Sequence, residues 1–258
     1  MKLCQIVQIE LKQWSFAGLI VLLAVSATTP WTSAKDQTKS TPKQEKSAAI
    51  QLYQKAREAR AVWRDFPGFS ADVTVLYNDQ STQGKITANK DFKVKLSLDD
   101  EQLVGWSLPK LRSVISHRKY RLQKPIPATF ADNQIHHPLG RLVNIDGKNV
   151  SFRLKDDVIT EVHRHSNKSW FTISILDVWR TKEGSVLPRN TSVTYRDPQT
   201  GTITLNRSNT FSFTHVGNFD LPEWMLTVEC SEDFERNVGS IKLSNHRLLT
   251  PESLSQTE

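Results

Sequence analysis

Two long stretches of the chain alternate between apolar and polar residues with a period of two. From Phe69 to Tyr77 apolar side chains fall at every second position, and residues 92–98 repeat the pattern. From about residue 139 to residue 248 the same period returns in short runs, separated by turn sequences such as Asp146-Gly147. Successive side chains of a strand point to opposite faces, so the pattern predicts half-buried strands joined by tight turns.

The alternating runs predict strands over residues 69–77, 83–88, 92–98, 139–145, 150–154, 158–165, 170–180, 191–196, 202–206, 210–216, 224–230 and 241–248. Short strands at regular spacing favour antiparallel pairing of chain neighbours. We therefore expect an α+β fold that is mostly antiparallel β, built as an open or half barrel or a strongly curved sheet. An N-terminal helix and one inserted, kinked helix complete the expected fold.

The two helices are expected where the apolar spacing changes from two to three and four. The first runs from a cap at Ser47 to about Trp63. The second starts after Asp99 or Asp100, either of which can cap it, and runs to about Ser116. Pro109 lies inside this second segment, and its ring cannot donate a backbone hydrogen bond, which predicts a kink or a break.

The first 34 residues have the pattern of a cleavable export signal. Lys2 and Lys12 precede an apolar core over residues 14–25, and small residues allow cleavage after Ala27 or after Ala34. The alternative is an uncleaved anchor, although this core is shorter than the ~20 residues of a spanning helix. We expect a flexible linker over residues 35–45, a single sheet-rich domain over residues 46–250 and a flexible tail over residues 251–258. The protein is then located in the periplasm or cell envelope.

The charge balance favours anionic partners. The chain has 34 Lys and Arg against 27 Asp and Glu, a formal charge of +7. Export disfavours nucleic acid as a partner, and the oligomeric state stays open. No acidic residue occurs between Gln102 and Ala131. Four basic residues of this stretch are expected to contact an anionic surface such as a membrane: Arg112, Arg118, Lys119 and Arg121.

The helix expected over residues 99–116 has three possible roles. It can rest on an anionic membrane, act as a mobile lid over an apolar cavity, or only cover the core with a solvated basic flank. For the second role we expect a cavity between the concave face of the sheet and the helices. Its lining would consist of Val73, Val75, Val94, Leu96, Leu103, Trp106, Leu111 and Ile115.

Sequence signatures of common enzymes are missing. The chain has no G-x-S-x-G, H-E-x-x-H, C-x-x-C or phosphate-binding glycine loop, so neither catalytic residues nor a cofactor are predicted. Glu161, His163 and His165 alternate along one expected strand and would project from the same face, as a divalent-metal site requires. The alternative is that they form the solvent face of a strand whose inner face carries Val158 and Val162.

Several short motifs resemble an uncharacterised family of exported bacterial and plastid proteins, known only as a domain of unknown function. They are Phe66-Pro-Gly-Phe69 with Ala71-Asp72, Ile115-Ser-His-Arg118, Leu187-Pro188, Val193-Thr-Tyr195 and Leu221-Pro222. The resemblance covers most of residues 48–228 and implies no known activity. The order of elements is also similar to that of periplasmic outer-membrane lipoprotein carrier proteins. That similarity implies a half-open barrel whose concave apolar face, covered by helices, holds acyl chains.

The sequence thus leaves three hypotheses for function. The first is a non-enzymatic binding protein of the periplasm or cell envelope that holds an apolar or lipid-like ligand in an open antiparallel barrel. The second is a metal-dependent envelope enzyme that uses Glu161, His163 and His165. The third is a structural or interaction module that docks on an anionic envelope polymer.

Overall fold

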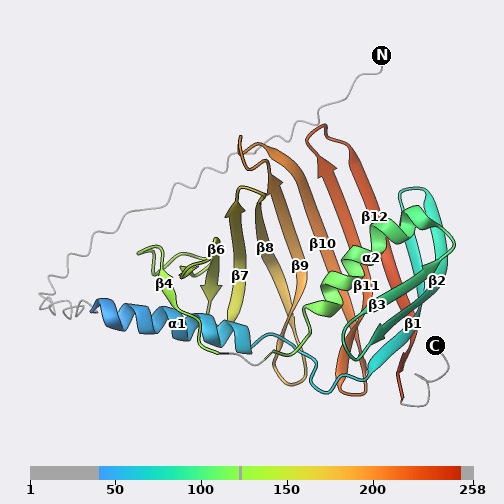
Figure 1. Cartoon of the computed structure of the whole chain (residues 1–258), viewed down its shortest axis with the longest axis horizontal. Helices are drawn as coiled ribbons and strands as arrows, with labels where there is room; N and C mark the ends of the chain where they lie inside the picture. The colour runs from blue at the N-terminus through green and yellow to red at the C-terminus, as the bar shows by residue number, and fades with distance from the viewer. Residues whose placement is uncertain (1–40, 122–123, 251–258) are drawn as a thin grey trace, which may run out of the picture. The chain divides into compact units, whose positions relative to one another are not determined.

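The computed structural model describes residues 41–121 and 124–250, which form two helices and one large sheet (Figure 1). The expected leader, the first six residues of the expected linker and the expected tail lie outside the described residues. The remaining linker residues do not form a separate segment, because the first helix already begins at Pro42.

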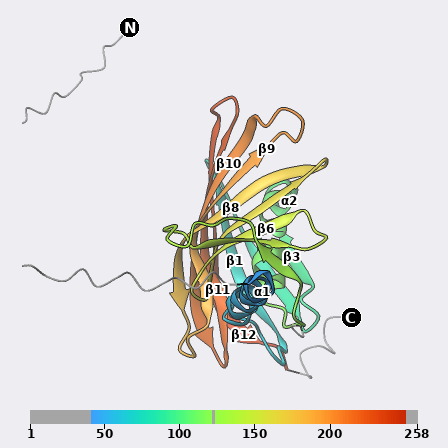
Figure 2. The ribbon, with the colours of Figure 1, turned by 90° about the vertical axis from the view of Figure 1, so that its left-hand side faces the viewer.

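The sheet has twelve strands, and all its pairings are antiparallel. The strands are β1 (Gly68–Tyr77), β2 (Gln80–Asn89), β3 (Val94–Leu98), β4 (Ala128–Phe130), β5 (Arg141–Ile145), β6 (Val150–Lys155), β7 (Val158–Ser166), β8 (Ser169–Arg180), β9 (Val186–Arg196), β10 (Ile203–Val216), β11 (Phe219–Ser231) and β12 (Arg236–Leu248). Their order is β3-β2-β1-β12-β11-β10-β9-β8-β7-β6-β5-β4. The sheet is curved and does not close, as Figure 2 shows, which confirms the predicted fold class.

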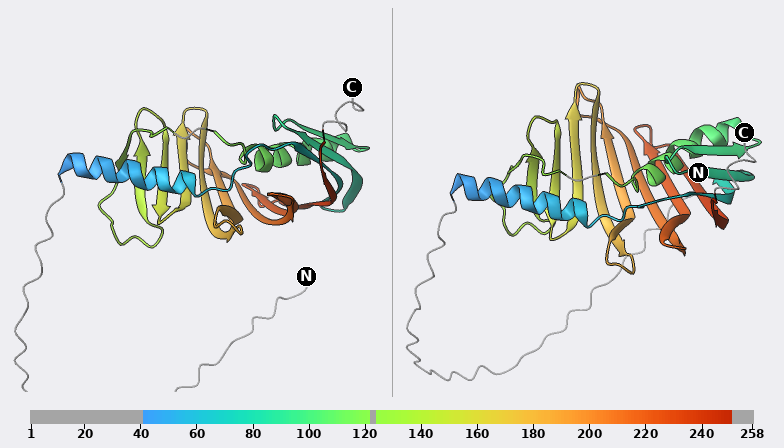
Figure 3. Two further views of the ribbon diagram at one scale, coloured as in Figure 1. Left: turned by 90° about the horizontal axis from the view of Figure 1, so that it is seen from below. Right: turned by 60° about the horizontal axis from the view of Figure 1, so that its bottom comes forward.

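The strand order forces two parts of the chain to cross the sheet. Because β1 pairs with β12, the two free edges are β3 and β4, which are consecutive in the sequence. The chain between them must travel from one edge to the other; α2 (Glu101–Ser116) and the described residues 117–121 and 124–127 lie on this path. In the opposite direction, α1 (Pro42–Glu58) packs on β4, β6 and β7, and residues 59–67 run back to β1. Figure 3 shows α1 and α2 on the same side of the sheet.

Residues 59–67 and 117–121, which we call the crossover, hold each other by hydrogen bonds. The backbone N–H of Trp63 donates to the carbonyl of Arg118 at 2.7 Å, and the Arg118 guanidinium donates to the carbonyl of Ala61 at 3.1 Å. Arg60 donates to the carbonyl of His117 at 3.1 Å. Ala61 also pairs with Val186 at the start of β9. The crossover is thereby attached to the sheet near its centre.

Two apolar clusters lie on the helix-covered face. The larger one joins buried residues of α2 to those of β1, β2, β3, β11 and β12, and includes Phe69, Val73 and Ile241. The smaller one joins α1 to β4, β5 and β6 through Ala49, Tyr53 and Val143. Each helix therefore covers one end of the sheet. Neither cluster includes a buried residue of β7, β8, β9 or β10.

The structure corrects several predicted boundaries. The first helix was expected to run from a cap at Ser47 to about Trp63, but helix α1 ends at Glu58. It begins at Pro42, because Thr41 and Gln44 form a capping box there. The expected strands at 202–206 and 210–216 are one strand, β10, which pairs with β11 from Leu205 to Val216 with one register shift between Ser212 and Phe213. The short strand β4 was not predicted.

Helix α2 confirms the second predicted helix. The Asp100 carboxylate accepts from the N–H of Leu103 at 3.0 Å, so this residue is the cap, and the helix ends at Ser116 with Pro109 inside it. Within the described part of the chain, neither helix is both long and apolar enough to cross a membrane.

Candidate functional site

A cavity of about 820 Å³ lies between the middle strands, α2 and the crossover. Its wall comes from alternate residues of β6 to β11, together with the end of α1 and one side of α2. The apolar lining residues are Ala56, Trp106, Pro109, Val114, Val150, Phe152, Ile159, Val162, Phe171, Ile173, Ile175, Val178, Val186, Pro188, Val193, Phe211, Phe213 and Met225. This volume lies within the range of small-molecule binding sites, roughly 300–1,000 Å³.

The two-residue period of the strands produces this apolar wall. On β8, Phe171, Ile173 and Ile175 line the cavity, whereas Thr172 and Ser174 between them do not. Phe171, Ile173 and Ile175 are only half-buried although they lie in the middle of the sheet. The centre of the sheet therefore presents an apolar surface that the protein itself does not cover.

The wall also contains a satisfied polar pair. Asn209 donates from its side-chain amide to the Thr191 hydroxyl at 3.2 Å and accepts from the Thr227 hydroxyl at 3.1 Å. Because these groups bond to one another across β9, β10 and β11, they do not need a partner inside the cavity.

At one end of the cavity, a carboxylate lies between two cationic side chains and forms an ion pair with each. Glu229 accepts from Arg207 at 2.6 Å and lies 3.5 Å from the Lys110 ammonium. Arg207 also donates to the Tyr195 hydroxyl at 3.1 Å. Burial lowers the pKa of Lys110, while the Glu229 carboxylate opposes that change. The Lys110 ammonium lies 4.3 Å from the ring centroid of Trp106.

The crossover end of the cavity carries cations without acidic partners. Arg60, His117 and Arg118 all line it. Loss of solvent, together with the charge of Arg60, lowers the pKa of Arg118 to about 9. His117 is exposed as a residue, but partial loss of solvent around its ring, together with the charges of Arg118, Arg60 and Arg121, lowers the pKa of His117 to about 4. At neutral pH this end therefore holds charged guanidinium groups beside a neutral imidazole.

Of the eight residues expected to line a cavity, one lines the cavity described above and seven belong to the larger apolar cluster or pack against it. Trp106 lines the cavity. Val73, Val75, Val94, Leu103, Leu111 and Ile115 are buried in the larger apolar cluster, with Leu96 packed against it. The reason is the helical spacing: Leu103, Leu111 and Ile115 form the stripe of α2 that faces the first strands. The cavity is faced by other stripes, Gly105-Pro109-Ser113 and Trp106-Lys110-Val114.

Of the four basic residues expected to contact an anionic surface, three are exposed and one is buried. Arg112, Lys119 and Arg121 are exposed. Arg118 is only 5% exposed and lines the cavity, so its side chain does not contribute to a surface patch. The burial follows from the crossover, which covers the guanidinium with the backbone of Ala61.

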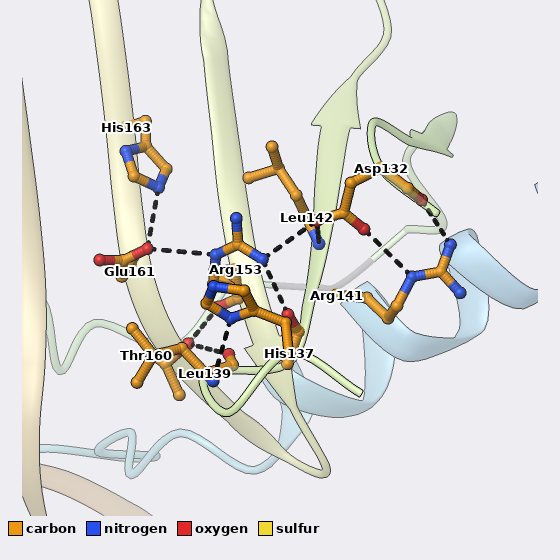
Figure 4. A network of polar contacts seen from close by, with 10 residues as sticks. Asp132, His137, Leu139, Arg141, Leu142, Arg153, Thr160, Glu161 and His163 are labelled. Carbon is orange, nitrogen blue, oxygen red and sulfur yellow. Dashed lines mark hydrogen bonds and ion pairs between the residues drawn. The ribbon is translucent and has the colours of Figure 1, made fainter. Parts of the chain in front are cut away.

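Two of the three candidate metal residues, Glu161 and His163 on β7, lie within a polar network (Figure 4). The Glu161 carboxylate lies 3.3 Å from Arg153 and 3.2 Å from His163, and accepts from Ser174 at 3.4 Å. His165 instead packs on the Trp170 ring at 4.5 Å. Over the described ranges, no three His, Cys, Asp or Glu side chains are grouped so that they could hold a metal ion. Glu161 and His163 lie close together, whereas the His165 ring packs against Trp170 and not against these two residues.

The same network extends to the edge of the sheet and fixes the strands there. Asp132 accepts from Arg141 at 3.3 Å and from Arg153 at 3.0 Å. Arg153 also donates to the carbonyl of Gly140 at 2.9 Å. Burial acts against ionisation of Asp132, but these hydrogen bonds outweigh it and lower its pKa. The outer face of β5 to β7 is thus a structural ion-pair network.

Most of the residues that line the cavity were not predicted as site residues. The expected strands include Phe171, Ile173, Val193 and Phe211. The alternation of apolar and polar residues, however, does not distinguish a strand face that lines a cavity from one that packs against a helix. A signal for Arg118 exists in the Ile115-Ser-His-Arg118 motif, which places a cation one turn after a buried isoleucine.

The match to a family model agrees with the resemblance seen in the motifs. The model, which describes a protein of unknown function, DUF3386, matches residues 44–249. The chain belongs to the DUF3386 family. Among the curated proteins compared with it, none matches. The cavity and crossover described above lie within the part of the chain that defines this family.

Among solved structures, the chain is similar to a DUF1329 family protein from Desulfovibrio piger, at 13% identity and a TM-score of 0.30, over 83% of this chain and 97% of that one. It is also similar to a LolA superfamily protein from Nitrosomonas europaea, at 6% identity and a TM-score of 0.28, over 81% and 96% of the two chains. A third similar structure is the MucA/MucB complex of Pseudomonas aeruginosa, at 13% identity and a TM-score of 0.13, over 81% and 96%.

Proposed function

We propose that this protein is a non-enzymatic binding protein of the cell envelope that holds an apolar or lipid-like ligand in the cavity under the crossover. The observation that carries the proposal is the half-buried apolar wall of β6 to β10, which encloses about 820 Å³ with α2 and the crossover. The envelope is proposed from the leader pattern of residues 1–34.

The energetics of the wall support an apolar ligand. Removing apolar surface from water contributes ~0.8 kcal/mol per methylene group. Ile173 on β8 pairs with Val193 on β9, and Phe171 on β8 and Phe211 on β10 add further apolar contacts to the same cavity wall. An acyl chain or another elongated hydrocarbon can contact all of them at once. The polar groups Asn209 and Thr191 already satisfy each other and do not compete for it.

A pair of adjacent substitutions tests the proposal. Ile173 lines the cavity and Thr172 points to the opposite face of the same strand. Ile173→Trp should occupy part of the cavity and weaken binding of N-phenylnaphthylamine, a neutral apolar dye, by about tenfold, which is 1.4 kcal/mol. Thr172→Trp is the matched control and should leave binding unchanged. Dye fluorescence titration measures both.

The outcomes separate the alternatives. Absence of saturable dye binding to the wild-type protein would exclude the proposed function. Equal weakening by both variants would show that the dye binds elsewhere or that added bulk perturbs the strand. Urea unfolding of each variant, compared with wild type, checks that a loss of binding does not come from a loss of folded protein.

A further inference from the structure

Arg118 is a buried cation whose charge has no acidic partner within residues 41–121 and 124–250. Arg118 is 5% exposed, and within the described residues its side chain forms one hydrogen bond, from Nη1 to the neutral carbonyl of Ala61 at 3.1 Å. The Nε–H of the same guanidinium is buried without a hydrogen-bond acceptor. A buried donor that is left unpaired costs roughly 1–3 kcal/mol, and more when the group is charged. Such a group requires an explanation.

A second guanidinium lies at the same end of the cavity. Arg60 lines the cavity beside Arg118 and bonds to the neutral carbonyl of His117 at 3.1 Å. Its pKa is lowered by burial, with Arg57 acting in the same direction and Tyr53 opposing. Like charges that are brought together away from water repel each other. In the part of the chain that the structure describes, no carboxylate forms an ion pair with either of them.

The carboxylates of the cavity wall do not balance these charges, because both have other partners. Asp157 is bound by both terminal nitrogens of Arg180, at 2.8 and 2.9 Å. Glu229, at the other end, is bound by Arg207 and Lys110. The lining as a whole contains five cationic side chains, Arg60, Lys110, Arg118, Arg164 and Arg207, against these two carboxylates. The cavity lining therefore carries a net positive charge, and the two guanidinium groups at the crossover end, which have no ion-pair partner among the described residues, contribute to it.

We propose that the cavity binds an anionic amphiphile, whose acidic head group, a carboxylate or phosphate, lies against Arg118 and Arg60 while its hydrocarbon tail lies on the wall of β6 to β10. A planar guanidinium with free N–H groups matches both kinds of oxyanion. The neutral His117 imidazole at this end adds no opposing negative charge. This inference rests on the proposed function and specifies the class of its ligand.

The test compares three probes with the same twelve-carbon tail, dodecanol, dodecanoate and dodecyl phosphate, as competitors of N-phenylnaphthylamine at pH 7.5. They are used below the concentrations at which they aggregate. For the wild-type protein, dodecanoate or dodecyl phosphate should bind at least about tenfold more tightly than dodecanol, because a charge-assisted hydrogen bond in a buried site contributes about 1.5–3 kcal/mol. The stronger of the two anions identifies the head group.

Arg118→Met and Arg60→Met should each reduce this anion preference, measured in each variant as the ratio of its dodecanol and anion dissociation constants, with Arg118→Met reaching a ratio within about threefold of one. Arg247→Met on β12 is the matched control, because Arg247 is exposed and does not line the cavity. It should keep the full preference. Urea unfolding of each variant, compared with wild type, shows that the variant is folded. If Arg118→Met does not fold, Arg60→Met carries the test.

The two proposals fail in different ways. Binding of dodecanol without any preference for the anions would overturn the head-group inference and keep the apolar cavity. A preference that persists in both Arg118→Met and Arg60→Met would also overturn it, since other cations would then be responsible. If no probe binds, the proposed function itself is wrong, and the head-group inference fails with it.

Discussion

The same concave face of the sheet is filled at one end and open in the middle. Under α2, Val73, Ile86 and Ile241 of the sheet meet Leu103 and Leu111 of the helix, and all five are at most 2% exposed. Across β8 to β10, side chains of the same types, such as Phe171 and Ile173, have no helix packed on them and line the cavity. The alternation of apolar and polar residues in a strand thus indicates only that one face is removed from water, and not what covers that face. Protein covers that face at one end, and we propose that a ligand covers it in the middle.

The largest expected difference between the two regions is in stability. Leu111→Ala removes a fully buried side chain from the filled end and should lower the free energy of unfolding by about 2–5 kcal/mol. Ile173→Ala trims a half-buried residue beside an existing cavity and should lower it by about 1 kcal/mol or less. Urea unfolding of both variants measures the contrast. Equal losses would show that the middle of the sheet is packed like the filled end.

A smaller effect is expected at the border between the two regions, where Trp106 meets β12. A Cβ atom added at Gly239 would lie 2.4 Å from the Trp106 ring, so Gly239→Ala must displace the indole. The expected cost is about 1–3 kcal/mol, as for other overpacked sites, together with altered dye binding. Gly105→Ala on α2 is the matched control, because its Cβ would meet nothing within 4 Å. It should stabilise the helix by roughly 0.5–1 kcal/mol. A Gly239→Ala variant with wild-type stability and unchanged dye binding would contradict the placement of Trp106.

The effect that is smallest at neutral pH is a pH dependence at the open region, because it develops only in acid. Loss of solvent and the nearby guanidinium charges lower the pKa of His117 in the folded protein to about 4, below the ~6.5 of an unfolded histidine. The unfolded state therefore binds the proton first as the pH falls. The contribution of His117 to stability is complete above pH ~6.5 and declines as the pH drops towards 4. His117→Gln should remove this part of the slope in pH-dependent thermal unfolding. An identical slope in the variant would assign the effect to another group.

The stripes of α2 show how far the sequence could predict the site. Apolar spacing located the helix, Asp99 or Asp100 was expected to cap it, and Leu103, Trp106, Leu111 and Ile115 were expected to line a cavity; the cap is Asp100. Leu103, Leu111 and Ile115 form one stripe of the helix. That stripe is the one that the sheet buries. The cavity is faced by the weaker stripes that contain Gly105, Pro109 and Lys110, which no hydrophobic pattern selects.

The sequence by itself determined the local elements of this protein. The period of two defined most of the strands, the change to helical spacing defined α2, and short motifs indicated the family before any model matched it. These features depend on neighbours within a few residues, so they can be recognised in a linear pattern.

The tertiary structure alone decided what covers the apolar face and where Arg118 lies. Both depend on the pairing of β1 with β12, strands separated by more than 150 residues, which makes β3 and β4 the edges and sends the chain across the sheet between them. In a basic run with no acidic residue, Arg118 looks like a solvated surface residue, and only the crossover buries it. Alternation shows which side chains must leave water, but the long-range path of the chain decides whether protein is available to cover them.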